Sequence, residues 1–254
     1  DFESDRIHAF GLVARDVCFR PSNWRCVRTI DQWMRDEQIP GVYNVDTREI
    51  TRRLRRMGSQ KCVISTEELG VEELARICGE YEMRGDAMKT AGVSEVTEWK
   101  AEHPRYRVAV MDFGVKRSIL KELAARGCDL TLFPYGTKAR TILDMHPDGV
   151  FLTNGPGDPE EAAEAVIITE KLVTNSNYGE QAMPIFGICM GHQIIALSQG
   201  GETYKLKYGH RGGNHGVFDK NTGRSYITSQ NHGYAVKAES IILHGLEVTH
   251  LNLN

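Results

Sequence analysis

The chain of 254 residues lacks several features that would define its class at once. No apolar run is long enough to cross a membrane, and Asp1-Phe2-Glu3-Ser4 has no basic-then-apolar leader character. A formal net charge of −3 gives no general attraction to nucleic acid or to an anionic membrane. Six cysteines are sparse for a disulfide scaffold and show no metal-type spacing. We therefore expect a cytoplasmic protein that binds no metal, nucleic acid or membrane.

What the chain does contain is a cysteine framed by glycines. The stretch 184–193 reads P-I-F-G-I-C-M-G-H-Q, a short apolar strand followed by Cys189 between Gly187 and Gly191. A tight turn from a strand into a helix strains its central residue, and glycines two positions to either side avoid Cβ clashes. The helix predicted over 190–198 directs its positive end at Cys189, which favours a thiolate. The pattern predicts a nucleophile, the alternative being an ordinary buried thiol.

Alternation of short apolar segments with amphipathic ones predicts an α/β protein that divides near residue 100. In its second part we expect a mostly parallel sheet flanked by helices, with strands over 107–111, 130–133, 149–153 and 184–187, helices over 116–126, 160–173 and 190–198, and antiparallel additions over 204–208 and 225–228. A smaller α/β domain should precede it, with a strand over 11–14, helices over 23–37, 47–57 and 71–80, and a linker over 85–105. The predicted domains are thus 1–100 and 101–254.

Several blocks carry a family resemblance. The G-I-C-M-G-H-Q block resembles the nucleophile motif of class I glutamine amidotransferases, which hydrolyse glutamine to glutamate and ammonia. Further blocks resemble the small, glutaminase subunit of carbamoyl phosphate synthetases: V-M-D-F-G-V-K at 110–116, L-T-N-G-P-G-D-P at 152–159, G-H-R-G-G-N-H at 209–215 and S-Q-N-H-G-Y-A-V at 229–236. The stretch N-V-D-T-R-E-I-T-R-R-L-R at 44–55 is similar to a segment of that subunit's first domain. The resemblance covers nearly the whole chain.

The resemblance implies a role for each matching residue. Cys189 attacks the glutamine carboxamide, and a glutamyl thioester remains for water to cleave. The backbone N–H groups of Met190 and Gly155 meet the developing oxyanion. Glutamine is held by Gly155, Gly157, Met190, Gln193, Asn231, Gly233 and Tyr234. No cofactor is expected in this subunit, because ATP and Mg belong to a large partner subunit that makes carbamoyl phosphate from bicarbonate for arginine and pyrimidine synthesis. Residues 1–100 would dock that partner.

The chain also departs from the family's pattern. In the family, the general base and its orienting acid come from a later His-Pro-Glu motif, and none occurs here. A glutamine-contacting serine that the family has before the stretch resembling Asp1-Phe2-Glu3-Ser4 is missing too, so we expect a chain cut at both ends, with little or no turnover alone. His146-Pro147-Asp148 is interpreted as a surface turn, and His232 as part of the substrate grip. Two alternatives stay open: the glutaminase of another amidotransferase or a related cysteine hydrolase, and a catalytically incomplete scaffold that docks a synthetase subunit.

Overall fold

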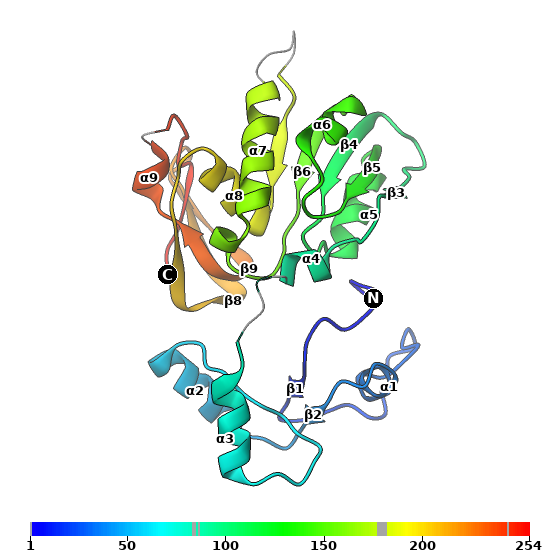
Figure 1. Ribbon diagram of the computed structural model, residues 1–254, viewed down its shortest axis with the longest axis vertical. Coiled ribbons are helices and arrows are strands. Elements are labelled where there is room, and N and C mark those ends of the chain that lie inside the picture. Colours follow the sequence, from blue (N-terminus) through cyan, green and yellow to red (C-terminus); the bar gives the residue numbers. More distant parts are fainter. Residues whose placement is uncertain (1, 83–84, 86, 177–181, 243) are drawn as a thin grey trace. The chain divides into compact units, whose positions relative to one another are not determined.

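The computed structural model describes residues 2–82, 85, 87–176, 182–242 and 244–254 (Figure 1). The chain forms two compact units, Asp1–Met83 and Arg84–Asn254. The segment 85–105, predicted as a linker, instead contains helix α4 (Ala87–Ala91) and strand β3 (Thr97–Trp99), and it belongs to the second unit. No helix among the described residues combines the length and the apolar character that a membrane crossing requires.

The first unit is small and thinly packed. Strands β1 (Leu12–Val13) and β2 (Gly41–Val42) pair in parallel, and three helices accompany them: α1 (Ile30–Asp36), α2 (Thr47–Met57) and α3 (Val71–Glu80). Helices α2 and α3 have the predicted bounds. Helix α1 begins later than predicted, because the side chain of Thr29 accepts from the backbone of Gln32 in a capping box that sets its start. Among the described hydrophobic residues of this unit, Met34 alone is buried.

The second unit is built on a five-stranded sheet with the strand order β3-β5-β4-β6-β7. Strands β4 (Tyr106–Met111), β5 (Cys128–Phe133), β6 (Gly149–Leu152) and β7 (Ile185–Gly187) run parallel, and β3 pairs with β5 in the antiparallel direction. The connecting helices are α5 (Arg117–Ala125), α6 (Ala139–Asp144), α7 (Ala163–Ser176) and α8 (Met190–Ser198), and a 3-10 turn, η1, covers Pro159–Glu161. The four parallel strands confirm the predicted fold class.

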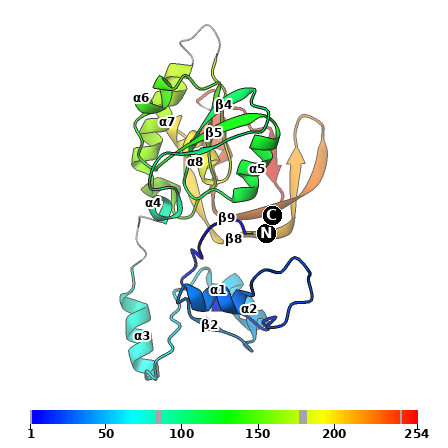
Figure 2. The same cartoon turned by 90° about the vertical axis from the view of Figure 1, so that its right-hand side faces the viewer.

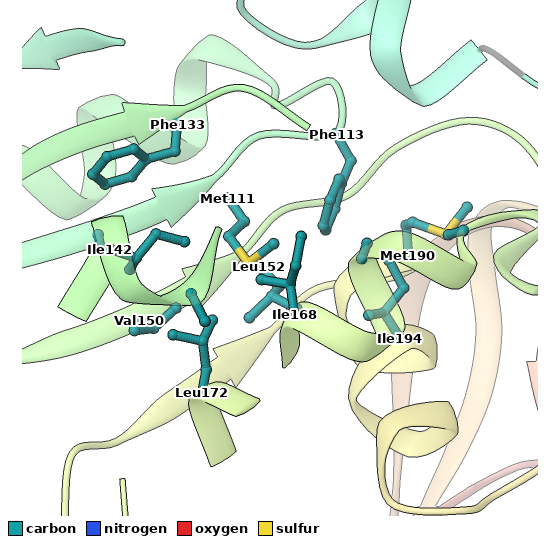
Figure 3. Packing of buried hydrophobic residues seen from close by; sticks show 14 of the residues in the cluster. Met111, Phe113, Phe133, Ile142, Val150, Leu152, Ile168, Leu172, Met190 and Ile194 are labelled. Atoms are coloured by element: carbon teal, nitrogen blue, oxygen red, sulfur yellow. The ribbon is translucent and has the colours of Figure 1, made fainter. Parts of the chain in front are cut away.

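Helices cover both faces of this sheet, α5 on one and α7 on the other (Figure 2). Because successive strand residues point to opposite faces, Val110 belongs to the α5 side while Met111 belongs to the α7 side. On the α7 side, Met111, Leu152 and Leu172 point into one dense cluster (Figure 3). Each such fully buried side chain stabilises the fold by about 1.5–3 kcal/mol. The same cluster includes Phe113, which follows β4, and Met190, which follows β7, so the core reaches the loops at the carboxyl ends of the strands.

A separate antiparallel sheet follows α8. Strands β8 (Thr203–Asp219) and β9 (Arg224–Val236) form a long hairpin, and β10 (His250–Asn252) pairs with β8. The short helix α9 (Ala238–Ile242) lies between β9 and β10 in the sequence. The predicted strands at 204–208 and 225–228 lie inside this hairpin, which is far longer than predicted.

Candidate active site

Cys189 occupies the predicted strained turn between β7 and α8. Its backbone adopts φ 53° and ψ −105°, a conformation that non-glycine residues rarely take. A Cβ at Gly187 would lie 2.5 Å from the carbonyl carbon of Gly191, and a Cβ at Gly191 would lie 2.2 Å from the Leu152 oxygen. Both glycines are therefore required by close backbone approach, and the turn holds Cys189 at the carboxyl end of the sheet.

The Cys189 thiol is half-buried and faces β9. Its Sγ lies 3.9 Å from the backbone oxygen of Asn231. Burial raises the pKa of Cys189, and the backbone N–H of Met190 opposes this by lowering it. The sequence predicts that the helix N-terminus favours a thiolate; this effect is present, but desolvation is larger and acts in the opposite direction. At rest the nucleophile is a thiol that must lose a proton before it attacks.

The glycine-rich loop after β6 is held against the loop after β4. A Cβ at Gly155 would lie 2.5 Å from the Phe113 oxygen, so only glycine permits this approach. The Thr153 hydroxyl accepts a 2.9 Å bond from the Phe113 N–H, and the Asn154 side chain donates to the Gly114 oxygen at 2.9 Å. These bonds fix the backbone that leads into Gly155.

The same loop adjoins the strained turn at residues 187–191, here called the elbow. The N–H of Gly191 donates to the Thr153 oxygen at 3.0 Å, and the N–H of Ile188 donates to the Leu152 oxygen at 3.1 Å. Gly157 follows in the left-handed region with φ 97°, which favours glycine. The loops after β6 and β7 therefore lie side by side at the sheet edge, as expected for parallel strands.

Two of the predicted glutamine contacts meet across α8 and β9. The side chain of Gln193 is only 5% exposed and donates from Nε2 to the backbone oxygen of Tyr234 at 2.6 Å. Gln193 thus ties the elbow helix to β9, which is more than capping that helix.

Tyr234 in turn connects β9 to the glycine loop through Asp158. Burial, the hydrogen bond to the Asp158 carboxylate and the negative charges of Asp158, Glu161 and Glu160 raise the pKa of Tyr234 to about 12. The phenol is therefore neutral at physiological pH. Asp158 also accepts from the Glu160 N–H at the start of η1, so its carboxylate serves both elements. Sequence reasoning did not single out Asp158, although its place in G-P-G-D-P was a signal.

Asn231 and Gly233 lie on β9, where Asn231 contacts the nucleophile and Gly233 lies near Arg211. Asn231 presents its backbone oxygen to Cys189, while its side-chain oxygen accepts a bond of 2.6 Å from Arg211 on β8. A Cβ at Gly233 would lie 3.8 Å from the Arg211 guanidinium. Arg211 was not among the predicted site residues, since its position depends on how β8 pairs with β9.

The histidines near the site are engaged with one another or open to solvent. His232 places Nδ1 2.7 Å from the Tyr234 oxygen and Nε2 3.0 Å from Gln230 Oε1 and 3.2 Å from His210 Nδ1. Within the described part of the chain no histidine forms a hydrogen bond with Cys189. Desolvation by the surrounding protein and the charge of His232 both lower the pKa of His192. The side chain of His192 is nevertheless still accessible to solvent. His146 lies in an exposed turn before β6, as predicted.

A cavity of about 670 Å³ adjoins this region. It is lined by His192, His210 and His232 together with residues of α9 and β10. The described residues contain no group of three or more His, Cys, Asp or Glu side chains arranged to hold a metal ion.

Fold and site together define the class of protein. A parallel sheet, a nucleophile turn after β7 and a glycine loop after β6 are the features of a class I glutamine amidotransferase, and the family model "Glutamine amidotransferase class-I" matches residues 109–254. A second model, "Carbamoyl-phosphate synthase small chain, CPSase domain", matches residues 1–64. The second match disfavours the alternative of another type of amidotransferase.

Two curated small chains match this chain along nearly its whole length. The carbamoyl phosphate synthase small chain of Clostridium acetobutylicum is 45% identical over 252 residues, covering 99% of this chain and 69% of that protein. The corresponding small chain of Fusobacterium nucleatum is 43% identical, covering 100% of this chain and 68% of that protein. A solved glutamine amidotransferase from Thermotoga maritima is 18% identical, with a TM-score of 0.41, over 53% of this chain and 64% of that one. The chain belongs to the carbamoyl phosphate synthase small chain family.

Proposed function

We propose that this protein hydrolyses glutamine at Cys189 and that the ammonia feeds carbamoyl phosphate synthesis by a large synthetase subunit. The observation that carries the proposal is the elbow, which combines φ 53° at Cys189 with two glycines that admit no side chain. Membership of the small chain family supports the choice of glutamine as substrate.

The chemistry follows the usual course of a cysteine nucleophile. After a base takes the thiol proton, Sγ bonds to the carboxamide carbon and the carbonyl oxygen becomes an oxyanion. When the C–N bond breaks, the departing nitrogen takes up a proton and leaves as ammonia, and a glutamyl thioester remains. Water then cleaves the C–S bond, which gives glutamate and restores the thiol.

The backbone supplies the proposed oxyanion donors. The Met190 N–H already points at the thiol, where it lowers its pKa, and the Gly155 N–H belongs to a loop bonded to the elbow. Removal of one such donor typically lowers kcat by about 10²–10³-fold. Because both are main-chain groups, methionine at position 190 is compatible with the role.

The remaining predicted contacts form the proposed grip on glutamine. Gly157, Gln193, Asn231, Gly233 and Tyr234 come from the glycine loop, α8 and β9. The bond from Gln193 to Tyr234 and the bond from Tyr234 to Asp158 brace these three elements against one another. The neutral phenol of Tyr234 adds no charge that would repel a substrate carboxylate.

An active-site label tests the function. A glutamine-mimicking diazoketone should modify Cys189 selectively, because recognition of its glutamine moiety holds the electrophile beside this thiol despite the raised pKa of the thiol. Bound glutamine should protect Cys189 from the label. Plain iodoacetamide is the matched control: it lacks the glutamine moiety and should prefer the exposed thiols Cys18, Cys26 and Cys62. Peptide mapping decides, and equal diazoketone labelling of Cys18 or Cys128, without protection by glutamine, would refute the assignment.

We further propose that the first unit docks the large subunit, where ATP and Mg are used. Helix α2 has no buried residue, and its arginines Arg48, Arg52, Arg53, Arg55 and Arg56 are all exposed. Among the described residues, its only ion pair is the 4.0 Å contact between Arg52 and Glu49. Arginine is enriched at protein interfaces, which supports this face as the contact.

Charge reversal tests this surface. Arg52→Glu combined with Arg55→Glu should abolish co-purification of the full-length protein with its large subunit while glutamine hydrolysis persists. Arg76→Ala on α3 is the control, because Arg76 is already paired with Glu73 and Glu80. Unchanged co-purification of the double variant would refute α2 as the docking face.

A further inference from the structure

The β8–β9 hairpin changes register on both sides of one short paired segment. His210, Arg211 and Gly212 pair with His232, Asn231 and Gln230, and the register shifts before His210 and after Gly212. Irregularities of this kind bend a strand and re-aim its side chains, and they occur often beside active sites. Here the regular segment between them lies opposite the part of β9 that faces Cys189.

Glycines make room for this arrangement. Gly209 and Gly212 have φ values of 75° and 138°, which other residues rarely adopt. A Cβ at Gly209 would lie 2.6 Å from the His232 oxygen and 3.4 Å from Arg211 Nη2. The missing side chain of Gly209 leaves the space beside β9 into which the guanidinium of Arg211 extends.

The contact between Arg211 and Asn231 orients the amide. Arg211 Nη1 donates to Asn231 Oδ1 at 2.6 Å. A guanidinium has no acceptor, so the Asn231 oxygen must face Arg211 and its NH₂ group must face away. A charged donor also makes this bond stronger than one between neutral groups. The side chain of Asn231 is therefore held in one of its two possible orientations.

We infer that Arg211 is a positioning residue for glutamine: by fixing the Asn231 amide, it presents the amide donors to the bound substrate. This rests on the proposed function, in which Asn231 contacts glutamine. Arg211 reaches the side chain of Asn231, whereas Cys189 faces its backbone oxygen. Loss of Arg211 should therefore weaken glutamine binding and leave the chemistry at Cys189 largely unchanged.

Steady-state kinetics on the full-length protein in complex with its large subunit test this. Arg211→Ala should raise the KM for glutamine about 10-fold, as expected for loss of a charge-assisted hydrogen bond, with kcat changed less than about 2-fold. Asn231→Ala should raise KM as well. In the Asn231→Ala background, Arg211→Ala should add nothing, because residues that act through one another are not additive. Independent, additive effects would overturn the inference, as would an unchanged KM in Arg211→Ala.

Two controls separate this inference from the proposed function. Arg224→Ala removes an exposed arginine from the same hairpin, opposite Asp219, and should leave KM unchanged. Glutamine affinity is also measured by calorimetry in a Cys189→Ala background, which needs no turnover. If the unsubstituted protein binds glutamine without hydrolysing it, the proposed function is refuted, while the role of Arg211 is still judged from glutamine affinity. If the unsubstituted protein binds no glutamine, both proposals are refuted.

Discussion

Replacing Gly191 with alanine should destabilise the second unit severely. The new Cβ would lie 2.2 Å from the Leu152 oxygen and 2.6 Å from the Leu152 carbonyl carbon. Ordinary contacts of this type need roughly 3.5 Å, so α8 and β6 would have to separate by about 1 Å. That movement would also stretch the 3.0 Å bond from the Gly191 N–H to the Thr153 oxygen. Overpacking typically costs about 1–3 kcal/mol, and with the strained hydrogen bond we expect at least about 3 kcal/mol.

Native-state hydrogen exchange in urea, read on peptides from β6 and α8, measures this loss directly. The matched control is Gly79→Ala, which makes the same substitution inside α3, where among the described residues no atom beyond the neighbouring backbone of the helix lies within 4 Å of the new Cβ. There alanine should stabilise the helix by about 0.5–1 kcal/mol in the peptides of α3. A Gly191→Ala protein with β6 and α8 destabilised by less than about 1 kcal/mol would refute the reasoning.

Two further predictions concern titrating groups. Because the folded pKa of Tyr234 is about 12 and an unfolded tyrosine ionises near 10, its stabilising effect is present below about pH 10 and is lost as the pH rises toward 12. Tyr234→Phe should therefore show a shallower loss of stability across that range in denaturation measurements, and an identical slope would contradict this. Because burial raises the pKa of Cys189, alkylation of this thiol by iodoacetamide should have a pH midpoint above the value of about 8.5 for free cysteine. A midpoint below that value would show that the helix N-terminus dominates after all.

The elements that could be predicted from the sequence are those whose boundaries are written locally. Helix α2 begins after Asp46, whose side chain accepts from the Glu49 N–H, and it ends at Gly58 with φ 85°. The second part of strand β4, residues 108–111, is a continuous apolar run, as expected for a strand buried on both faces. By contrast, β3 has only three residues and exists through its pairing with β5, which nothing in T-E-W specifies.

The hairpin shows the same limit more clearly. The alternation that predicts strands is interrupted in β8 by glycines and by polar residues, because the register shifts twice. Only short pieces of β8 and β9 could therefore be predicted, and the pairing of Arg211 with Asn231 could not.

For the site, the motif located Cys189 and its glycines, because backbone strain leaves a local signature. The direction of the Cys189 pKa shift was missed for a different reason. The helix N-terminus is visible in sequence, whereas desolvation depends on which distant segments cover the thiol, here including β9. Burial is a property of tertiary packing, and it is the reason that the pKa of Cys189 is raised and not lowered.

The glycines of this site also limit how its specificity can change. Gly155, Gly187 and Gly191 are pressed against neighbouring main chain, so any side chain there displaces a strand or a helix. These three positions therefore tolerate almost no substitution, whether it arises by mutation or by design. On the hairpin, by contrast, the side chains of Arg211, Asn231 and Tyr234 are held by hydrogen bonds and not by close main-chain approach, so they could be randomised with far less risk to the fold. A library aimed at substrates other than glutamine belongs on the hairpin, with the elbow left untouched.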